Sequence, residues 1–277
     1  MFNLSPLYFP ITAKPGDTNE FQPSPALQPY IRCFWGSVDD AASLYEAKAE
    51  TIIPDTCMDI IWSLDGESGL ANTFFSGIND TPFEVPSDRA EGKHLIFGIR
   101  FHFWAVHFFV DDHLRNVLNA HVDVEQYFGS FKRELGHLLE KVNSMHERIA
   151  AAEAYLLRRL EHRGRTNERM MNAIYTLVKQ KGMVSAEELE NSSNLGRRQL
   201  ERLFQEYIGI SPKKTADLVR FQNVWREMYH LAGERKNMQD VVFDYGYSHQ
   251  SHFINNFKKY AGRTPREALR YASREMS

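Results

Sequence analysis

Residues 244–253 read Asp244-Tyr245-Gly246-Tyr247-Ser248-His249-Gln250-Ser251-His252-Phe253, and they decide the fold of the C-terminal third. Gly246 predicts a tight turn, and the residues after it predict an amphipathic helix with Phe253 and Phe257 on one face. Gly262 ends this helix, and Thr264-Pro265 begins the next, because a Thr N-cap before a proline starts a helix cleanly. A short helix, a tight turn and a longer helix form the plan of a helix-turn-helix unit.

The same pattern occurs 53 residues earlier in the chain. The second helix of each copy is expected to enter a major groove of DNA. Two copies joined by a long helix could therefore read successive grooves about one DNA turn (~34 Å) apart. The matching positions are Leu200 with Phe253, Phe204 with Phe257, Tyr207 with Tyr260, Gly209 with Gly262, and Pro212 with Pro265.

Helical spacing continues through the whole C-terminal region. Ser185 and Glu188 have the spacing of a capping box, Gly182 is an expected C-cap, and Ser248 is the expected N-cap of the second recognition helix. The expected helices are 169–181, 186–191, 196–207, 212–231, 238–244, 248–260 and 265–273.

The stretch from about residue 168 to 274 resembles the DNA-binding domain of the AraC family of bacterial regulators. The resemblance rests on residues 244–253, continued by Phe257, Tyr260, Gly262 and Thr264-Pro265. The first unit departs from the family pattern, since Gly196 replaces a capping Ser or Thr and Ser193-Asn194 occupy a turn that more often contains Gly. The resemblance implies a regulator of transcription, such as an activator. Double-stranded DNA and RNA polymerase are its candidate partners, and no catalytic residue or cofactor is expected.

In the first recognition helix, the expected buried stripe is Leu200, Leu203, Phe204 and Tyr207, and the opposite face carries four charged residues. Arginine can bind guanine O6 and N7 with two hydrogen bonds, and a carboxylate can accept from cytosine N4. The alternative is a solvated face on which Glu201 pairs with a neighbouring arginine. The candidate base-reading residues are Arg197, Arg198, Glu201 and Arg202.

In the second recognition helix, neutral side chains suited to adenine and to the thymine methyl group face outward. These candidates are His249, Gln250, Ser251, Ile254 and Asn255, whereas His252 is expected to support the turn within the fold. Basic residues near both helices are expected to contact phosphates, which orient a protein on DNA without specifying sequence. The candidates are Lys213, Lys214, Lys258, Lys259 and Arg263.

The 277 residues allow two domains, and charge divides them unequally. Residues 1–162 hold 13 Lys and Arg against 23 Asp and Glu, whereas residues 163–277 hold 20 against 13. A basic surface is also common on proteins that bind no nucleic acid, so this asymmetry supports the DNA-binding interpretation without establishing it. We expect domains at 1–162 and 163–277, with the polar segment 161–166 as the linker.

The N-terminal region combines β-like runs with a later helical segment. Six prolines in the first 30 residues indicate extended chain. We expect strands at 30–35, 49–53, 58–64, 73–76 and 94–101, separated by turns at 65–66, 77–80 and 91–92, then helices at 124–142 and 146–160. The expected fold class is therefore α+β. The N-terminal domain is expected to be cupin-like or a β-barrel with a helical annex, and to serve as a sensor or in dimerisation, whereas the C-terminal domain is expected to be all-α.

Residues 27–35, 53–55 and 97–101 are similar to a poorly characterised N-terminal domain that is fused to AraC-type regulators, although Thr56 stands where a Gly often follows Asp55. Such a domain suggests two further candidate partners, an unknown small-molecule effector and a second copy of the chain in a homodimer. His94, His102 and His107 suggest a metal site, but no metal-binding triplet is present, and His102 and His107 are expected to be packing or interface residues.

Cys33 and Cys57 are too few for a zinc-bound cysteine cluster, and Cys57 is expected to be a buried small hydrophobe. The sequence shows no signal peptide and no apolar run long enough to cross a membrane, so the cytoplasm is the expected location. The rival hypothesis is an enzyme or small-molecule-binding protein whose helical domain serves protein contacts only.

Overall fold

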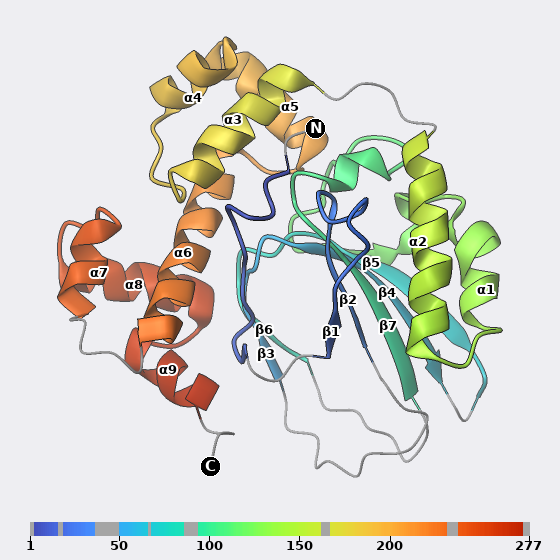
Figure 1. The fold of residues 1–277 in the computed structure, drawn as a ribbon. Coiled ribbons are helices and arrows are strands. Elements are labelled where there is room, and N and C mark those ends of the chain that lie inside the picture. Colours follow the sequence, from blue (N-terminus) through green and yellow to red (C-terminus); the bar gives the residue numbers. More distant parts are fainter. Residues whose placement is uncertain are drawn as a thin grey trace.

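The computed structural model describes residues 3–15, 19–36, 50–65, 68–85, 94–161, 167–231 and 238–273. An antiparallel sheet with a helical layer forms the N-terminal region, and the C-terminal region is entirely helical in its described part (Figure 1). The α+β class is confirmed. The predicted linker residues 162–166, the turn at 91–92, Gly66 and Ala49 lie outside the described residues.

A six-stranded antiparallel sheet has the order β1-β2-β7-β4-β5-β8. The sequence predicted β2, β4, β5 and β7 to within two residues, because apolar side chains and turn signals mark them. The edge strands β1 and β8 have only two and three residues, too few to show a pattern. The bounds are β1 Glu20–Phe21, β2 Ile31–Gly36, β4 Met58–Asp65, β5 Ala71–Ser76, β7 His94–Phe101 and β8 His121–Asp123.

Two further strands, β3 (Glu50–Ile52) and β6 (Phe83–Val85), form a separate antiparallel ribbon between the main sheet and the C-terminal helices (Figure 1). The sequence predicted β3 but missed β6, whose three residues are all exposed. Among the described residues no ladder joins β1 to β8. The sheet is therefore open, and of the two predicted forms the closed barrel is not observed.

The helical annex covers one face of the sheet (Figure 1). Its main helix, α2 (Met145–Glu161), agrees with the prediction, and the Arg148 guanidinium lies over the Trp62 ring of β4 at 5.5 Å. The predicted helix 124–142 is wrong over its first part, and only residues 131–139 form a continuous helical run. The chain instead forms a 3₁₀ turn, η2 (Val124–Gln126), a π-helical turn, η3 (Lys132–Gly136), and one short turn, α1 (His137–Leu139).

Core packing explains this difference, because Tyr127 and Phe128 both turn inward against Phe75, at ring distances of 5.1 and 5.5 Å. The Gly129 amide then donates to Asp111 Oδ2 at 2.6 Å, a bond made outside any helix. Leu138, predicted on the buried stripe, is consequently 43% exposed.

The C-terminal helices begin and end close to their predicted positions. Ser185 and Glu188 form the predicted capping box, and Ser211 accepts a hydrogen bond from the Lys214 amide at 3.2 Å at the start of α6. Phe221 of α6 contacts Phe257 of α8 at 5.4 Å. The bounds are α3 Glu168–Lys179, α4 Ala186–Ser193, α5 Arg197–Tyr207, α6 Pro212–Leu231, α7 Met238–Asp244, α8 Gln250–Ala261 and α9 Pro265–Ser273.

The first residues of the chain lie between the two regions (Figure 1). Gln222 of α6 accepts from the Ile11 amide at 2.9 Å and donates to the Pro54 carbonyl oxygen at 2.7 Å. Trp225 Nε1 donates to the Thr12 carbonyl oxygen at 2.9 Å. Because Gln222 is buried, its two bonds satisfy polar groups that water cannot reach, and they fix α6 against the N-terminal region.

Candidate functional site

The first helix-turn-helix unit consists of α4 and α5. The turn between them passes through Asn194, whose φ of 51° lies in the left-handed region that asparagine tolerates. Leu200, Leu203 and Phe204 form the buried stripe of α5, whereas Tyr207, which was predicted on the same stripe, is half-buried. The N-cap of α5 is Gly196, which has no side chain to bond the first amides.

The second unit consists of α7 and α8, with Gly246 at φ 64° in the turn. Its N-cap is His249, whose Nδ1 accepts from the His252 amide at 3.1 Å. The prediction of Ser248 as N-cap is therefore wrong by one residue. Ser248 Oγ instead lies 3.2 Å from His252 Nδ1, so His252 supports the turn within the fold as expected.

Most predicted base-reading side chains lie on the surface of the two recognition helices. On α5, Arg202 pairs with Glu206 at 3.1 Å, one turn further along the helix. His249 keeps only Nε2 for a base, because its Nδ1 caps α8. Glu201 and Ile254 are half-buried, whereas the exposed members of the set are Arg197, Arg198, Arg202, His249, Gln250, Ser251 and Asn255.

The predicted phosphate-binding residues divide into two groups. Lys213, Lys258 and Lys259 are exposed. Lys214 and Arg263, in contrast, are half-buried against the N-terminal region.

The half-buried group has acidic partners far away in the sequence. Lys214 forms an ion pair with Asp80. Arg263 donates to Thr51 Oγ1 at 2.8 Å and lies 3.7 Å from Glu84. No local pattern in the sequence marks Asp80 or Glu84 as a partner of these cations, although Asp80 lies in the predicted turn at 77–80.

The environment of Asp80 favours its charged form. Burial opposes ionisation, but hydrogen bonds from Lys214 and Asn119, with the charges of Lys214 and Lys259, hold the pKa of Asp80 below its usual value. Asn119 Nδ2 donates to Asp80 Oδ1 at 2.8 Å, and Asn119 Oδ1 accepts from the Asp80 amide at 3.1 Å. Asp80 is therefore negatively charged and held in place at neutral pH.

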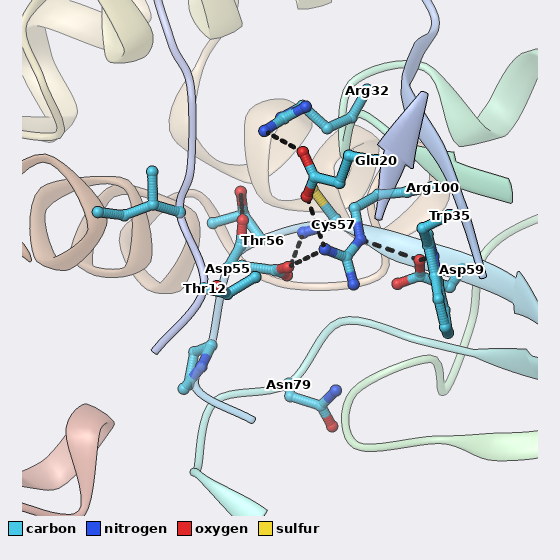
Figure 2. A network of polar contacts seen from close by, with 12 residues as sticks. Thr12, Glu20, Arg32, Trp35, Asp55, Thr56, Cys57, Asp59, Asn79 and Arg100 are labelled. Carbon is cyan, nitrogen blue, oxygen red and sulfur yellow. Dashed lines mark hydrogen bonds and ion pairs between the residues drawn. The ribbon is translucent and has the colours of Figure 1, made fainter. Parts of the chain in front are cut away.

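A second polar cluster lies on the sheet face away from α2, and Figure 2 shows its members around one guanidinium group. Arg100 Nε lies 3.0 Å from Asp59 Oδ1, and Arg100 Nη1 lies 3.5 Å from Asp55 and 3.9 Å from Glu20. Trp35 Nε1 donates to the same Asp59 oxygen at 2.8 Å. Three carboxylates from different segments thus hold one arginine.

Burial tunes the titratable groups of this cluster. Burial raises the pKa of Asp59, and the nearby Arg100 charge opposes that rise. Burial alone would lower the pKa of Arg100, but Asp59 and Asp55 raise it above its usual value. Burial likewise raises the pKa of the Cys57 thiol, so Cys57 is the small buried hydrophobe that the sequence predicted.

The histidines considered as metal ligands have other neighbours. The ring of His102 stacks on Trp104 at 4.3 Å, and burial lowers the pKa of His102 to about 3. The ring of His107 contacts Tyr207 at 4.8 Å, and the side chain of His94 lies outside the described part of the chain. In the residues that the structure describes, no three His, Cys, Asp or Glu side chains form a group that could hold a metal ion.

Two family models match this chain. A model described as a helix-turn-helix domain matches residues 189–271, and a domain of unknown function, DUF6597, matches residues 19–123. The XylDLEGF operon transcriptional activator of Pseudomonas putida is 23% identical over 94 residues, which cover 34% of this chain and 29% of that protein. The chain therefore spans less than a third of the curated relative that it matches.

Two solved structures are also similar. A transcriptional regulator from Chromobacterium violaceum with an AraC-type DNA-binding domain is 22% identical, with 39% of this chain and 95% of that chain covered and a TM-score of 0.35. ToxT from Vibrio cholerae is 12% identical, with 86% and 98% covered and a TM-score of 0.41.

No helix in the described ranges combines the length and the apolar character needed to cross a bilayer. The C-terminal region has two helix-turn-helix units in tandem, residues 244–253 lie in the second, and the family match begins within α4 and continues through α8 into α9. This region is therefore an AraC-type helix-turn-helix domain.

Proposed function

We propose that this protein is a sequence-specific regulator of transcription that binds double-stranded DNA. The observation that carries the proposal is the pair of recognition helices, α5 and α8, each with a buried apolar stripe and an exposed polar face. Such a face is what a helix needs to reach base edges in a major groove. A regulator of this kind works where the chromosome is, in the cytoplasm of a bacterial cell.

The two faces suit different bases. The arginines of α5 suit guanine, whereas Gln250 and Asn255 of α8 suit adenine. Lys213, Lys258 and Lys259 supply exposed positive charge for phosphates.

We further propose a division of labour along the chain. Residues 163–277 read DNA, and residues 1–162 sense a small-molecule effector or form a homodimer. The separate family matches at 19–123 and 189–271 support two modules. Contact with RNA polymerase would complete the role of an activator.

The experiment compares Arg202→Ala with Lys259→Ala on a specific and on a random duplex. Arg202→Ala should cost about 1–3 kcal/mol on the specific site and relax its sequence preference, because a base contact is lost. Lys259→Ala should weaken binding to both duplexes alike and reduce the salt slope by about one, because a phosphate contact is lost.

The rival function, a helical domain that serves protein contacts only, predicts a different result. Binding to duplex DNA would then be absent, or would show no steep fall of log affinity with log salt. Equal losses on both duplexes for Arg202→Ala would remove the base-reading role from that residue.

A further inference from the structure

One short segment of the N-terminal region contacts the residues that follow each recognition helix, at the start of α6 after the first unit and just after α8 in the second. It runs from the loop after β5 into β6, residues 80–84, and its alternate residues face the C-terminal helices. Asp80 pairs with Lys214 at the start of α6, and Glu84 lies 3.7 Å from Arg263, just after α8. Between them, the Pro82 ring lies against Gly262, where an added Cβ would be 3.2 Å from Pro82 Cγ.

The cations that this segment occupies are two of the residues assigned to phosphate contacts. A carboxylate and a phosphate oxygen make the same charge-assisted hydrogen bonds to Lys and Arg. One ammonium or guanidinium group cannot neutralise a carboxylate of its own chain and a DNA phosphate at the same time. The Asp80–Lys214 pair is also sheltered, with side-chain exposures of 13% and 32%, which limits screening by salt.

The carboxylates also have hydrogen-bond partners within the N-terminal region. Asn119 makes two hydrogen bonds to Asp80, one to the side chain and one to the backbone. Thr51 Oγ1 donates to Glu84 Oε1 at 2.8 Å across the β3–β6 ribbon and accepts from Arg263. Both acids are thus held by the N-terminal region itself.

We propose that residues 80–84 act as an internal phosphate mimic that occupies Lys214 and Arg263 and so competes with DNA. This inference rests on the proposed DNA-binding function and concerns its regulation. In the docked arrangement one phosphate-binding cation after each recognition helix is occupied, and tight DNA binding requires that the segment be displaced. A signal that loosens residues 80–84 from α6 and α8 would therefore increase DNA affinity.

The test uses the full chain and a random-sequence duplex at two salt concentrations. Asp80→Asn/Glu84→Gln keeps the size of both side chains and removes both charges. Glu125→Gln/Glu140→Gln is the matched control, since it removes two exposed charges of the same region. We expect the first variant to bind about three- to tenfold more tightly than the wild type and the control to change binding less than about twofold, in line with the modest strength of such pairs.

The slope of log affinity against log salt gives a second readout. Salt weakens the internal pairs as well as the DNA contacts, so the wild-type slope should be shallower than that of Asp80→Asn/Glu84→Gln. Asn119→Gly, which keeps the left-handed backbone at φ 54°, should shift affinity in the same direction by a smaller factor.

A third readout needs no DNA. In the wild type, Lys214 should be acetylated more slowly than exposed Lys213, and Asp80→Asn should remove most of that difference. An unchanged Lys214 rate, or equal duplex affinity of the double variant and its control, would overturn the phosphate mimic alone. A raised Lys214 rate with no duplex binding by any form would instead refute the proposed function, and the mimic with it.

Discussion

The first helix-turn-helix unit presents three exposed arginines from α5, whereas the second presents neutral polar side chains from α8. Both units share the same buried stripe, the same glycine after the recognition helix and the same proline that begins the next helix. The two copies therefore share their buried apolar positions and their turn residues, and they differ in the exposed face that is proposed to read DNA. The two units are expected to read different sequences.

The units also dock differently on the N-terminal region. The first is held at the end of α5, where the Leu114 amide donates to the Glu206 carbonyl oxygen at 3.1 Å and His113 lies 3.6 Å from Glu206. The second is held by the exposed ribbon strand β6 and the loop before it. The contact on the first unit is closer, because Gly209 packs directly against the backbone of Leu114.

The largest expected effect contrasts the matched glycines. At Gly209, with φ 86°, an added Cβ would lie 2.4 Å from the Leu114 carbonyl oxygen. Gly209→Ala should cost about 2–5 kcal/mol of unfolding free energy, from left-handed strain and overpacking together. Gly262→Ala, with only a proline ring at 3.2 Å, should cost about 1–2 kcal/mol. Equal losses in chemical denaturation would contradict the difference in docking.

The next effect concerns base reading. Arg198→Ala and Asn255→Ala should each cost about 1–3 kcal/mol on a specific duplex. The reason is that each removes a base contact from one unit only. When the two variants select sites from a random duplex pool, the sequence preference should therefore relax in one half of the site for Arg198→Ala and in the other half for Asn255→Ala. Relaxation of the same half by both variants would show that the units do not read separately.

A smaller effect tests the two helix caps. Ser185→Ala removes the side chain that accepts from the Glu188 amide and should cost about 1 kcal/mol of unfolding free energy. Ser248→Ala should cost less than about 0.5 kcal/mol, because His249 and not Ser248 caps α8. A larger loss at Ser248 than at Ser185 would restore the original assignment of the cap.

The smallest effect is a gain. Gly196 caps α5 without a side chain, its φ is −71°, and an added Cβ would meet nothing within 4 Å. Gly196→Ser should add about 0.3 kcal/mol of unfolding free energy, because serine is a slightly better N-cap than glycine. Thermal unfolding of the variant and the wild type measures this difference, and a lower free energy of unfolding for the variant would show that Gly196 has another role.

Local signals made the C-terminal helices predictable. The helices that begin at Pro212 and Pro265 were placed correctly because Ser211 and Thr264 cap them, and the capping box at Ser185 fixed α4. The same kind of signal placed β4 and β7, whose apolar runs end at turns.

Tertiary contacts explain what the sequence could not show. The helical spacing of 124–142 was overridden because Tyr127 and Phe128 pack into the sheet core. Lys214 and Asp80 are 134 positions apart, and no local pattern links them. Thr56 adopts φ 65°, a left-handed conformation that favours glycine, and its hydroxyl donates to the Asp55 carbonyl oxygen at 2.5 Å.

Selection of binding sites from a random duplex pool, with the full chain and with Asp80→Asn/Glu84→Gln, shows whether both recognition helices read DNA. We expect an enriched motif of two different blocks about one helical turn apart, with stronger enrichment for the variant. A single block, or no enrichment by either form at low and at high salt, would contradict the claim that two recognition helices read DNA together.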